Sequence, residues 1–462
     1  EDILCFFGGY SIESVDRSLL AIQKTLTDWY RANRRDLPWR RTKDPYAILV
    51  SELMLQQTGV ETVIPYYERF MRSFPTLHSL AKAGSDEVLK SWEGLGYYAR
   101  ARNLHEACRL IVERQGGKIP EDYADLVKLP GIGAYTAGAV LSIAYEKPYS
   151  SVDGNVHRVF SRVYLNHALS NAREEKRYTR GLAETYIQIA VRGGISPSEF
   201  NQAYMELGAL VCGPDHYLCE RCPIADSCRA RATGLQPAHP LKETKVAVEK
   251  KEMEVGIIWR RQRLLLEKRN EKALLRGFWG LPTVEVTPGS DPGQSLAFLL
   301  ASHFRIDGIH LKELFKEQHV FTHQRWRMRV FQAFCDSSKS EDSESSHPFS
   351  FFNSDQIPVL AIPKAFRKVL DRYAGRQLHV VAAIIKDKRG RVFVAKRNAD
   401  GYFGNYWEFP GGKVEPGETE EVALAREIQE ELSITVEPTR FLWRETYAYP
   451  FGQLQIAFFE CE

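Results

Sequence analysis

The sequence predicts a multidomain protein in which an all-α domain precedes two smaller domains that combine strands with helices. The chain has 462 residues, enough for about three domains of ordinary size. Residues 11–234 carry apolar side chains at helical spacing, whereas short strand-like runs dominate from Met253 onward. We therefore expect domains at 11–234, 253–374 and 378–462, with a linker at 235–252.

The helical part is marked by apolar stripes and glycine stop signals. Leu19, Ile22 and Leu26 recur at a spacing that places them on one helix face. Gly116–Gly117 and Gly193–Gly194 interrupt the helical pattern. The segment 235–252 combines prolines with a run of Lys and Glu, which is typical of a solvated linker.

The remaining elements follow from composition and alternation. Asp336–Ser350 is rich in serine and acidic residues, so we expect a flexible loop there. A helix is expected at Lys364–Tyr373. The expected strands are Val255–Trp259, Leu264–Glu267, His319–Thr322, Arg327–Phe334, His379–Lys386 and Arg391–Arg397.

Composition describes an ordinary globular protein with a large core. Hydrophobic residues make up 44% and charged residues 26%, and the net charge of +3 permits nucleic-acid binding without arguing for it. Four of the eight cysteines are scattered singly, which favours thiols in a reducing compartment. No signal peptide or membrane-length apolar run is visible, so we expect a cytoplasmic protein without a membrane partner.

The other four cysteines form one compact motif. Cys212, Cys219, Cys222 and Cys228 have the spacing C-x6-C-x2-C-x5-C, so their thiolates can close on a single metal centre. Four soft thiolates select zinc or an iron–sulfur cluster. Zinc sites usually pair two CxxC knuckles, and the second knuckle is absent here. The motif therefore favours a [4Fe–4S] cluster.

A glycine-containing turn lies near the middle of the helical part. In Leu129–Gly138, Gly131 and Gly133 would let backbone N–H groups approach a phosphate closely. About twenty residues later, Asp153 stands at an expected helix start, followed by Gly154-Asn155-Val156-His157-Arg158. Together these motifs resemble the helix–hairpin–helix DNA glycosylases, whose endonuclease III and MutY branches carry a cluster with the same cysteine spacing.

Two positions distinguish these branches. The endonuclease III branch has a lysine where this chain has Tyr135, and tyrosine cannot form a Schiff base. Glu52 lies within an otherwise apolar helix, an environment that raises the pKa of a carboxyl group. With Leu37–Arg40 and Gly94–Arg102, residues 17 to 234 closely resemble the MutY family, adenine glycosylases that act on adenine mispaired with 8-oxoguanine or guanine.

This resemblance implies roles for individual residues. Glu52 would be the general acid at N7 of a flipped-out adenine. Asp153 would stabilise the sugar cation or bond covalently to C1′, and the sequence does not choose between these. Tyr135 and Asn155 would support the two carboxylates. The implied adenine pocket consists of Arg35, Trp39, Leu55 and Gln202, and the implied contacts to the opposite strand are Gln57, Thr58, Leu95 and Tyr97.

The middle domain resembles the C-terminal domain of MutY proteins, a relative of the Nudix fold. It lacks the acidic Nudix helix, so it should bind rather than hydrolyse. Phe321-Thr322-His323 matches the family's Phe-Ser-His element that reads 8-oxoguanine, with Thr in place of Ser.

The third domain carries a nearly complete Nudix box. Gly412, Glu418, Arg426, Glu427, Glu430 and Glu431 match its pattern, and Ser433 replaces a glycine. On a helix Glu427, Glu430 and Glu431 would converge on one face and attract Mg²⁺. The resemblance to MutT-type hydrolases of 8-oxo-dGTP adds the Gly411 carbonyl as a ligand. Residues 378–462 correspond to about two-thirds of such a domain, so we expect weak hydrolysis at most.

The sequence thus predicts an α-helical helix–hairpin–helix glycosylase with a [4Fe–4S] loop, then an α+β Nudix-like domain, then a partial α/β/α Nudix domain. Its partners would be duplex DNA with A:8-oxoguanine or A:G mispairs and 8-oxo-dGTP, and we expect a monomer. Two alternatives are an endonuclease III-like lyase and a non-catalytic DNA-damage binder. Tyr135 opposes the first, and the presence of both Glu52 and Asp153 opposes the second.

Overall fold

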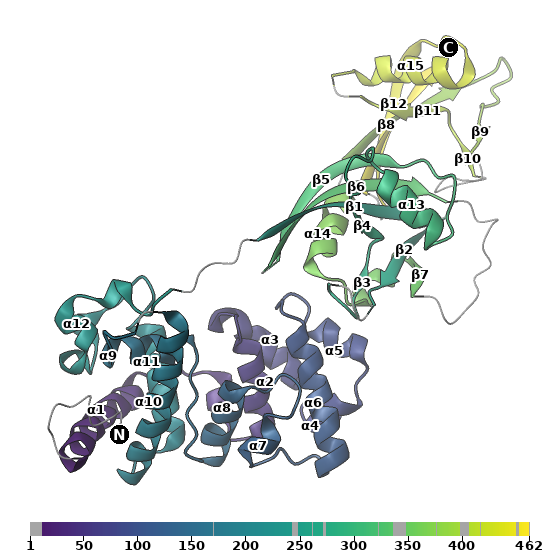
Figure 1. The fold of residues 1–462 in the computed structure, drawn as a ribbon. Helices are drawn as coiled ribbons and strands as arrows, with labels where there is room; N and C mark the ends of the chain where they lie inside the picture. The colour runs from purple at the N-terminus through teal and green to yellow at the C-terminus, as the bar shows by residue number, and fades with distance from the viewer. Residues whose placement is uncertain are drawn as a thin grey trace. The chain divides into compact units, whose positions relative to one another are not determined.

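The computed structural model divides the chain into two compact units, one ending at Lys245 and the other starting at Val246 (Figure 1). It describes residues 12–169, 171–242, 248–260, 262–270, 274–321, 323–335, 348–375, 377–397, 406–415, 417–449 and 452–461. In this part of the chain, none of the helices combines the length and the apolar character needed to cross a membrane.

The first unit is helical, as expected. Its α-helices are α1 (Ile12–Asn33), α2 (Pro45–Leu55), α3 (Val60–Ser73), α4 (Leu77–Lys82), α5 (Ser85–Ser91), α6 (Ala99–Gln115), α7 (Tyr123–Leu126), α8 (Ala134–Tyr145), α9 (Gly154–Val163), α10 (Ala172–Arg192), α11 (Pro197–Leu210) and α12 (Arg229–Thr233). Short 3-10 turns occur at Pro38–Arg40, Cys219–Arg221, Ala225–Ser227 and Gln236–Ala238.

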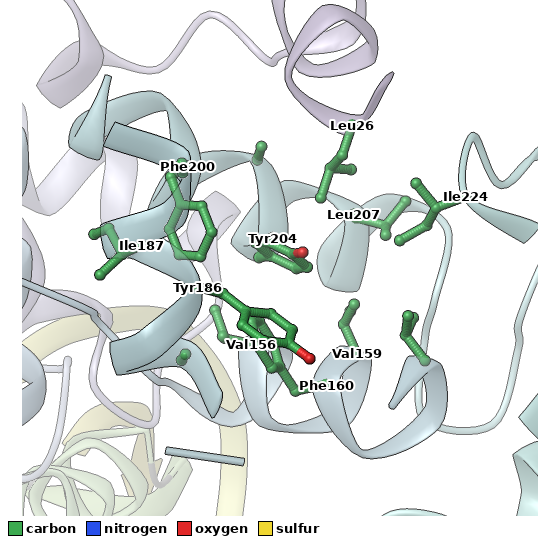
Figure 2. Packing of buried hydrophobic residues seen from close by; sticks show 14 of the residues in the cluster. Leu26, Val156, Val159, Phe160, Tyr186, Ile187, Phe200, Tyr204, Leu207 and Ile224 are labelled. Atoms are coloured by element: carbon green, nitrogen blue, oxygen red, sulfur yellow. The ribbon is translucent and has the colours of Figure 1, made fainter. Parts of the chain in front are cut away.

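Aromatic packing joins α9, α10 and α11 in one of the cores of this unit. Phe160 of α9 lies 4.6 Å from Tyr204 of α11 between ring centroids, and Tyr186 of α10 packs on the same cluster (Figure 2). Burying such rings stabilises a domain by about 1.5–3 kcal/mol per side chain. This core fixes the start of α9, where Asp153 lies.

The middle part is a sheet with a helix on each face. Its strand order is β3-β2-β1-β6-β5, with β4 paired to β1 and β7 to β2. Helix α14 (Lys364–Ala374) packs on the face that carries Val255 and Met328, and α13 (Gln294–Ser302) packs on the other. The strands are β1 (Glu249–Arg260), β2 (Arg263–Lys268), β3 (Trp279–Gly280), β4 (Thr283–Glu285), β5 (Lys312–Val320), β6 (Gln324–Phe334) and β7 (Phe349–Asn353).

The C-terminal part has a four-stranded sheet in the order β11-β8-β13-β12, covered by one helix. Helix α15 (Glu420–Leu432) buries Ala423, Leu424 and Ile428 against this sheet. The strands are β8 (Gln377–Ile385), β9 (Ala395–Lys396), β10 (Trp407–Glu408), β11 (Gly411–Lys413), β12 (Pro438–Tyr449) and β13 (Gly452–Cys461).

Three expectations need correction. The linker is shorter than 235–252, because the amide of Leu241 donates to Glu175 of the first unit and β1 already starts at Glu249. The loop expected at Asp336–Ser350 ends earlier, since β7 begins at Phe349, and residues 336–347 lie outside the described ones. The strand expected at Arg391–Arg397 is reduced to Ala395–Lys396, paired with β10, and an isolated bridge at Val392.

Candidate functional site

A cavity of about 910 Å³ in the first unit gathers most of the residues that the sequence singled out. Its walls come from the end of α2, the 129–134 turn, the start of α9 and α11. The expected site residues that line it are Arg35, Trp39, Glu52, Leu55, Gln57, Thr58, Gly131, Gly133, Tyr135, Asp153, Asn155 and Gln202. Leu95 and Tyr97 lie outside this lining.

Glu52 is a buried carboxylic acid in the last turn of α2. Its side chain is in the apolar surroundings that the sequence predicted, and the residue is 5% exposed. Burial raises its pKa to about 7, and the nearby Asp153 adds to the increase. The hydroxyl of Tyr135 donates a short hydrogen bond to Glu52, which opposes the shift without cancelling it. Glu52 can therefore hold a proton near neutral pH.

Asp153 occupies the N-cap of α9. One carboxylate oxygen accepts from the amide of Val156 at 2.7 Å, and the other accepts from the side-chain amide of Asn155 at 2.9 Å. Burial raises the pKa of Asp153, while these two hydrogen bonds favour its charged form. The cap thus points a fixed carboxylate into the same cavity as Glu52.

Asn155 is held from two sides. Gly208 of α11 lies so close that a Cβ there would be 2.6 Å from the Cβ of Asn155. Arg158 donates to the Asn155 side-chain oxygen at 2.8 Å and to the backbone oxygen of Cys212 at 2.7 Å. The Asp153 carboxylate is therefore connected to the cysteine loop through two side chains.

The far wall of the cavity contains a buried ion-pair network that the sequence did not reveal. Glu206 of α11 has a fully buried side chain and accepts from Arg35 and Arg40, each at 2.8 Å. Burial alone would raise the pKa of Glu206, but the two guanidinium groups outweigh it and lower the pKa to about 2. This pairing fixes the orientation of Arg35.

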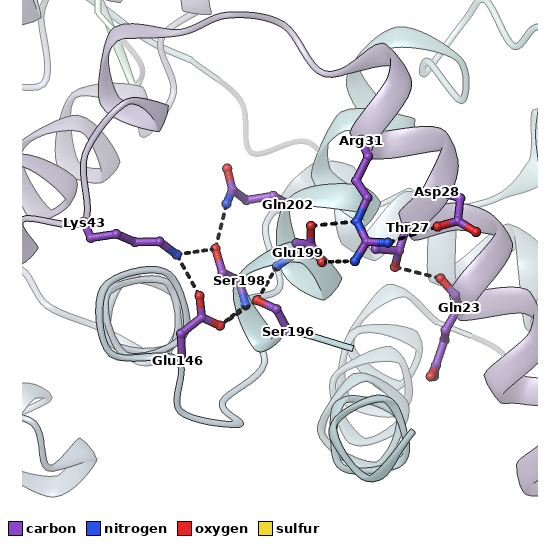
Figure 3. Close-up of polar contacts among 10 residues, drawn as sticks. All are labelled: Gln23, Thr27, Asp28, Arg31, Lys43, Glu146, Ser196, Ser198, Glu199 and Gln202. Atoms are coloured by element: carbon purple, nitrogen blue, oxygen red, sulfur yellow. Dashed lines mark hydrogen bonds and ion pairs between the residues drawn. The ribbon is translucent and has the colours of Figure 1, made fainter. Parts of the chain in front are cut away.

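Gln202 is oriented by polar neighbours. Its side-chain oxygen accepts from the Tyr30 hydroxyl at 3.0 Å and from Arg40 at 3.2 Å. Its nitrogen donates to Ser198 at 2.9 Å, in the network that Figure 3 shows. These hydrogen bonds fix the orientation of the Gln202 amide, so the same edge of the amide always faces the cavity.

The turn at 129–134 has the backbone form expected of a glycine hairpin. Gly131 has φ +76°, and a Cβ there would lie 2.7 Å from the Cβ of Asn103. Gly133 is the N-cap of α8, with no atom within 4 Å of the position where its Cβ would be. The space beside Gly133 is therefore open, and Gly131, Gly133 and Ala134 line the cavity.

The four residues expected to meet the opposite strand differ in exposure. Gln57 and Thr58 line the cavity, and Tyr97 is 44% exposed with φ +47°. Leu95 is 6% exposed and packs in the core, so its side chain does not support the expected contact. Buried Arg100 joins both segments, since it donates to the Thr58 hydroxyl at 3.1 Å and to the Gly96 carbonyl at 3.1 Å.

The four cysteines of the motif line one small cavity between α9, α11 and their own loop. Buried Arg162 donates to the sulfur of Cys212 at 3.3 Å, and Gln236 to the sulfur of Cys219 at 3.7 Å. Across the described ranges, no three His, Cys, Asp or Glu side chains are arranged to hold a single metal ion. The donor set and the shared cavity fit a multi-iron cluster, whose thiolates stand farther apart than those around one zinc ion.

In the second unit, the β5–β6 hairpin carries the residues expected to read 8-oxoguanine. Phe321 packs edge-on against Trp326 at 4.9 Å between ring centroids, so it belongs to the core of the sheet. His323 is exposed at the tip, and Thr322 lies outside the described residues.

The Nudix-box residues lie in the second half of α15 and in the segment that precedes this helix. Arg426 makes two hydrogen bonds to Glu418, at 2.8 and 3.0 Å, and one to Glu427 at 2.8 Å. Glu431 accepts from the amide of Gly411 at 3.4 Å, and a Cβ on Gly412 would clash with Glu427. The side chain of Glu430 is 62% exposed, and its carboxylate lies 3.6 Å from Arg426, which also pairs with Glu427.

Ser433 ends α15 in the left-handed conformation, with φ +56° and ψ +30°. The Nudix pattern has glycine at this position, and glycine adopts a positive φ without strain. The serine is therefore strained by about 1–2 kcal/mol relative to glycine.

The fold and the site define a helix–hairpin–helix protein of base excision DNA repair joined to Nudix-like domains. Residues 50–184 match the HhH-GPD superfamily base excision DNA repair protein, and residues 254–372 and 376–460 each match a NUDIX domain. The chain belongs to the adenine DNA glycosylase family, also called the MutY family.

Two relatives carry this assignment. The adenine DNA glycosylase of Homo sapiens is 32% identical over 77% of this chain and 74% of its own length. That of Buchnera aphidicola subsp. Schizaphis graminum is 31% identical over 77% of this chain and 99% of its own length. The solved structure of a thermostable thymine-DNA glycosylase is also similar, with 29% identity, a TM-score of 0.43 and coverage of 48% of this chain and 99% of that chain.

Proposed function

We propose that this chain is a monofunctional adenine DNA glycosylase that removes adenine paired with 8-oxoguanine or guanine in duplex DNA. The observation that carries the proposal is the pairing of a protonatable Glu52 with a capped Asp153 in one cavity. A base inside a duplex cannot reach a cavity of this kind, so the adenine must be flipped out of the stack.

Glu52 and Asp153 act on different parts of the substrate. Glu52 gives its proton to N7 of adenine, the C1′–N9 bond breaks, and its electron pair leaves with the base. The Asp153 carboxylate faces the positive charge that develops on the sugar. Water then adds to C1′ and its proton returns to Glu52, so the products are free adenine and an abasic site.

Strand cleavage is not part of this proposal. A lyase forms a Schiff base between an amine and C1′, and the residue beside Glu52 at this point is Tyr135. Its hydroxyl donates to Glu52 instead, which positions the acid.

Single-turnover excision assays on duplexes with A:8-oxoguanine, A:G and A:T pairs test this function. We expect release of adenine from the first two, and loss of release in Glu52→Gln and Asp153→Asn variants that still bind the duplex. Asparagine is as good an N-cap as aspartate, so Asp153→Asn should keep α9 intact. Normal excision by either variant would remove that carboxylate from the mechanism.

The base opposite adenine would be read by the β5–β6 hairpin of the second unit. We propose this role for Phe321, Thr322 and His323 because the exposed tip is anchored by Phe321 in the sheet core. A His323→Ala variant should lower the preference for A:8-oxoguanine over A:G more than it lowers the rate on A:G. Equal losses on both duplexes would contradict the assignment.

The cysteine loop would hold a [4Fe–4S] cluster bound by Cys212, Cys219, Cys222 and Cys228. The shared cavity of the four thiols supports this. Protein purified without oxygen should be brown and contain iron, and stoichiometric zinc in a colourless protein would overturn the proposal. A Cys219→Ser variant should weaken DNA binding more than the chemical step.

A second activity is proposed for residues 378–462, supported by the ordered Arg426–Glu418 pair and the carboxylates of α15. This domain would remove diphosphate from an oxidised nucleoside triphosphate such as 8-oxo-dGTP. Glu427, Glu430, Glu431 and the Gly411 carbonyl would hold Mg²⁺, which supplies charge neutralisation at the diphosphate. Hydrolysis should require Mg²⁺ and be lost in Glu430→Gln, while adenine excision stays unchanged. Hydrolysis that survives this substitution would exclude the assigned site.

A further inference from the structure

Three arginines form a row along β6. Arg325, Arg327 and Arg329 alternate with Trp326, Met328 and Val330, which are buried in the core that α14 covers. Successive side chains of a strand point to opposite faces, so the arginines lie on the other face of the sheet. The row starts two residues after His323, at the exposed hairpin tip.

The neighbouring strands add two lysines to the same face. Directly paired residues share a face, and the register sets Lys250 of β1 beside Arg325 and Lys316 of β5 beside Arg329. We call Lys250, Lys316, Arg325, Arg327 and Arg329 the basic face; all five are exposed or half-buried. In the sheet order, β1, β6 and β5 lie side by side (Figure 1).

Carboxylates neutralise only part of this charge, although the register sets Glu252 beside Arg327 and Glu254 beside Arg329. Glu252 pairs with Arg327 at 3.3 Å, and Glu313 lies opposite Phe331 beyond the end of the row. Glu254 is buried and accepts from the amides of Gly293 and Leu296 at the start of α13. Among the described residues, none accepts a hydrogen bond from the side chains of Arg325 or Arg329, and both residues are partly exposed. Their exposed guanidinium atoms can therefore meet a ligand.

We propose that the basic face binds the phosphate backbone of the DNA strand whose oxidised base the hairpin tip reads. This inference rests on the proposed glycosylase function. From Arg325 to Arg329 the row spans roughly 13 Å, at about 3.3 Å per residue. About four phosphates of one DNA strand lie within such a length of duplex axis. The charge of Arg325 and Arg329 and their position beside the tip both favour DNA over other partners.

The affinity for DNA and the rate of adenine excision can be measured separately. The test variant is Arg325→Gln with Arg329→Gln, which removes two charges and keeps long polar side chains. The matched control is Lys388→Gln with Arg389→Gln, which removes two charges from an exposed turn of the C-terminal part. Affinity is measured by fluorescence anisotropy across a salt series, on an A:8-oxoguanine duplex whose adenosine carries a 2′-fluorine that blocks excision.

For the test variant we expect a Kd raised roughly three- to ten-fold and a salt slope reduced by about 1.8, since each lost phosphate contact removes about 0.9. The single-turnover excision rate at saturating enzyme should stay within about two-fold of the parent. Affinity and slope equal to those of the control would overturn the proposal and point to an acidic protein as the partner. If the parent bound DNA through this face but released no adenine, the glycosylase function would fail while the basic face stood.

Discussion

The burial of Glu52 predicts how the stability of the folded protein depends on pH, independently of catalysis. The pKa of Glu52 is about 7 in the folded protein, against an ordinary value of 4.5. A carboxyl group whose pKa is raised by folding contributes to the free energy of unfolding at low pH, where it is protonated. This contribution is lost as the pH rises to about 7. Above that pH the folded protein must hold a buried charge.

The magnitude follows from the two pKa values. A difference of 2.5 units, at about 1.4 kcal/mol per unit, gives a penalty of roughly 3 kcal/mol at pH 8. A Glu52→Gln variant has no such penalty, and its amide oxygen can still accept from Tyr135. The gain in unfolding free energy over the parent should therefore grow by about 2–3 kcal/mol between pH 5 and pH 8.

Pulse proteolysis in urea measures this difference, because fragment size separates the helical unit from the rest of the chain. Glu113→Gln, an exposed change on α6, is the matched control and should show no growth with pH. A Glu52→Gln difference that stays constant from pH 5 to pH 8 would refute the buried, proton-binding state of this acid. The same variant should release no adenine at any of these pH values.

Three further outcomes are expected. Tyr135→Lys should introduce strand nicking through a Schiff base that borohydride traps, whereas efficient trapping with the parent would favour the lyase alternative. Gly208→Ala should lower excision about ten-fold or more because its Cβ would displace Asn155; Gly181→Ala on α10 meets no atom within 4 Å and should leave excision normal. Ser433→Gly should raise the unfolding free energy of the C-terminal part by about 1 kcal/mol in urea titrations, and an unchanged midpoint would show that the left-handed serine is not strained.

Sequence patterns anticipated local features better than distant pairings. The apolar neighbours of Glu52 in one helix predicted its burial, and the structure confirms it. Glu206 was missed because its partners Arg35 and Arg40 are more than 160 residues away along the chain. The apolar run at 392–394 favoured a strand, yet these residues are 39–44% exposed because little of the segment pairs with another strand. Leu95 was assigned to DNA by resemblance, but an apolar side chain in a turn can equally complete the core.

The side chain of Arg100 joins three segments of the helical unit through hydrogen bonds. Helix α2 ends at Leu55, so the carbonyls of Leu53 and Met54 have no partners further along the helix. Arg100 donates to both, and also to the turns that hold Thr58 and Tyr97. The acid of α2, one residue before Leu53, is thus fastened to the same cation as two surface loops. The backbone of Tyr97 and the end of α2 therefore share one guanidinium group as their hydrogen-bond donor. A lysine has three donors in place of five and could not keep all three segments in register.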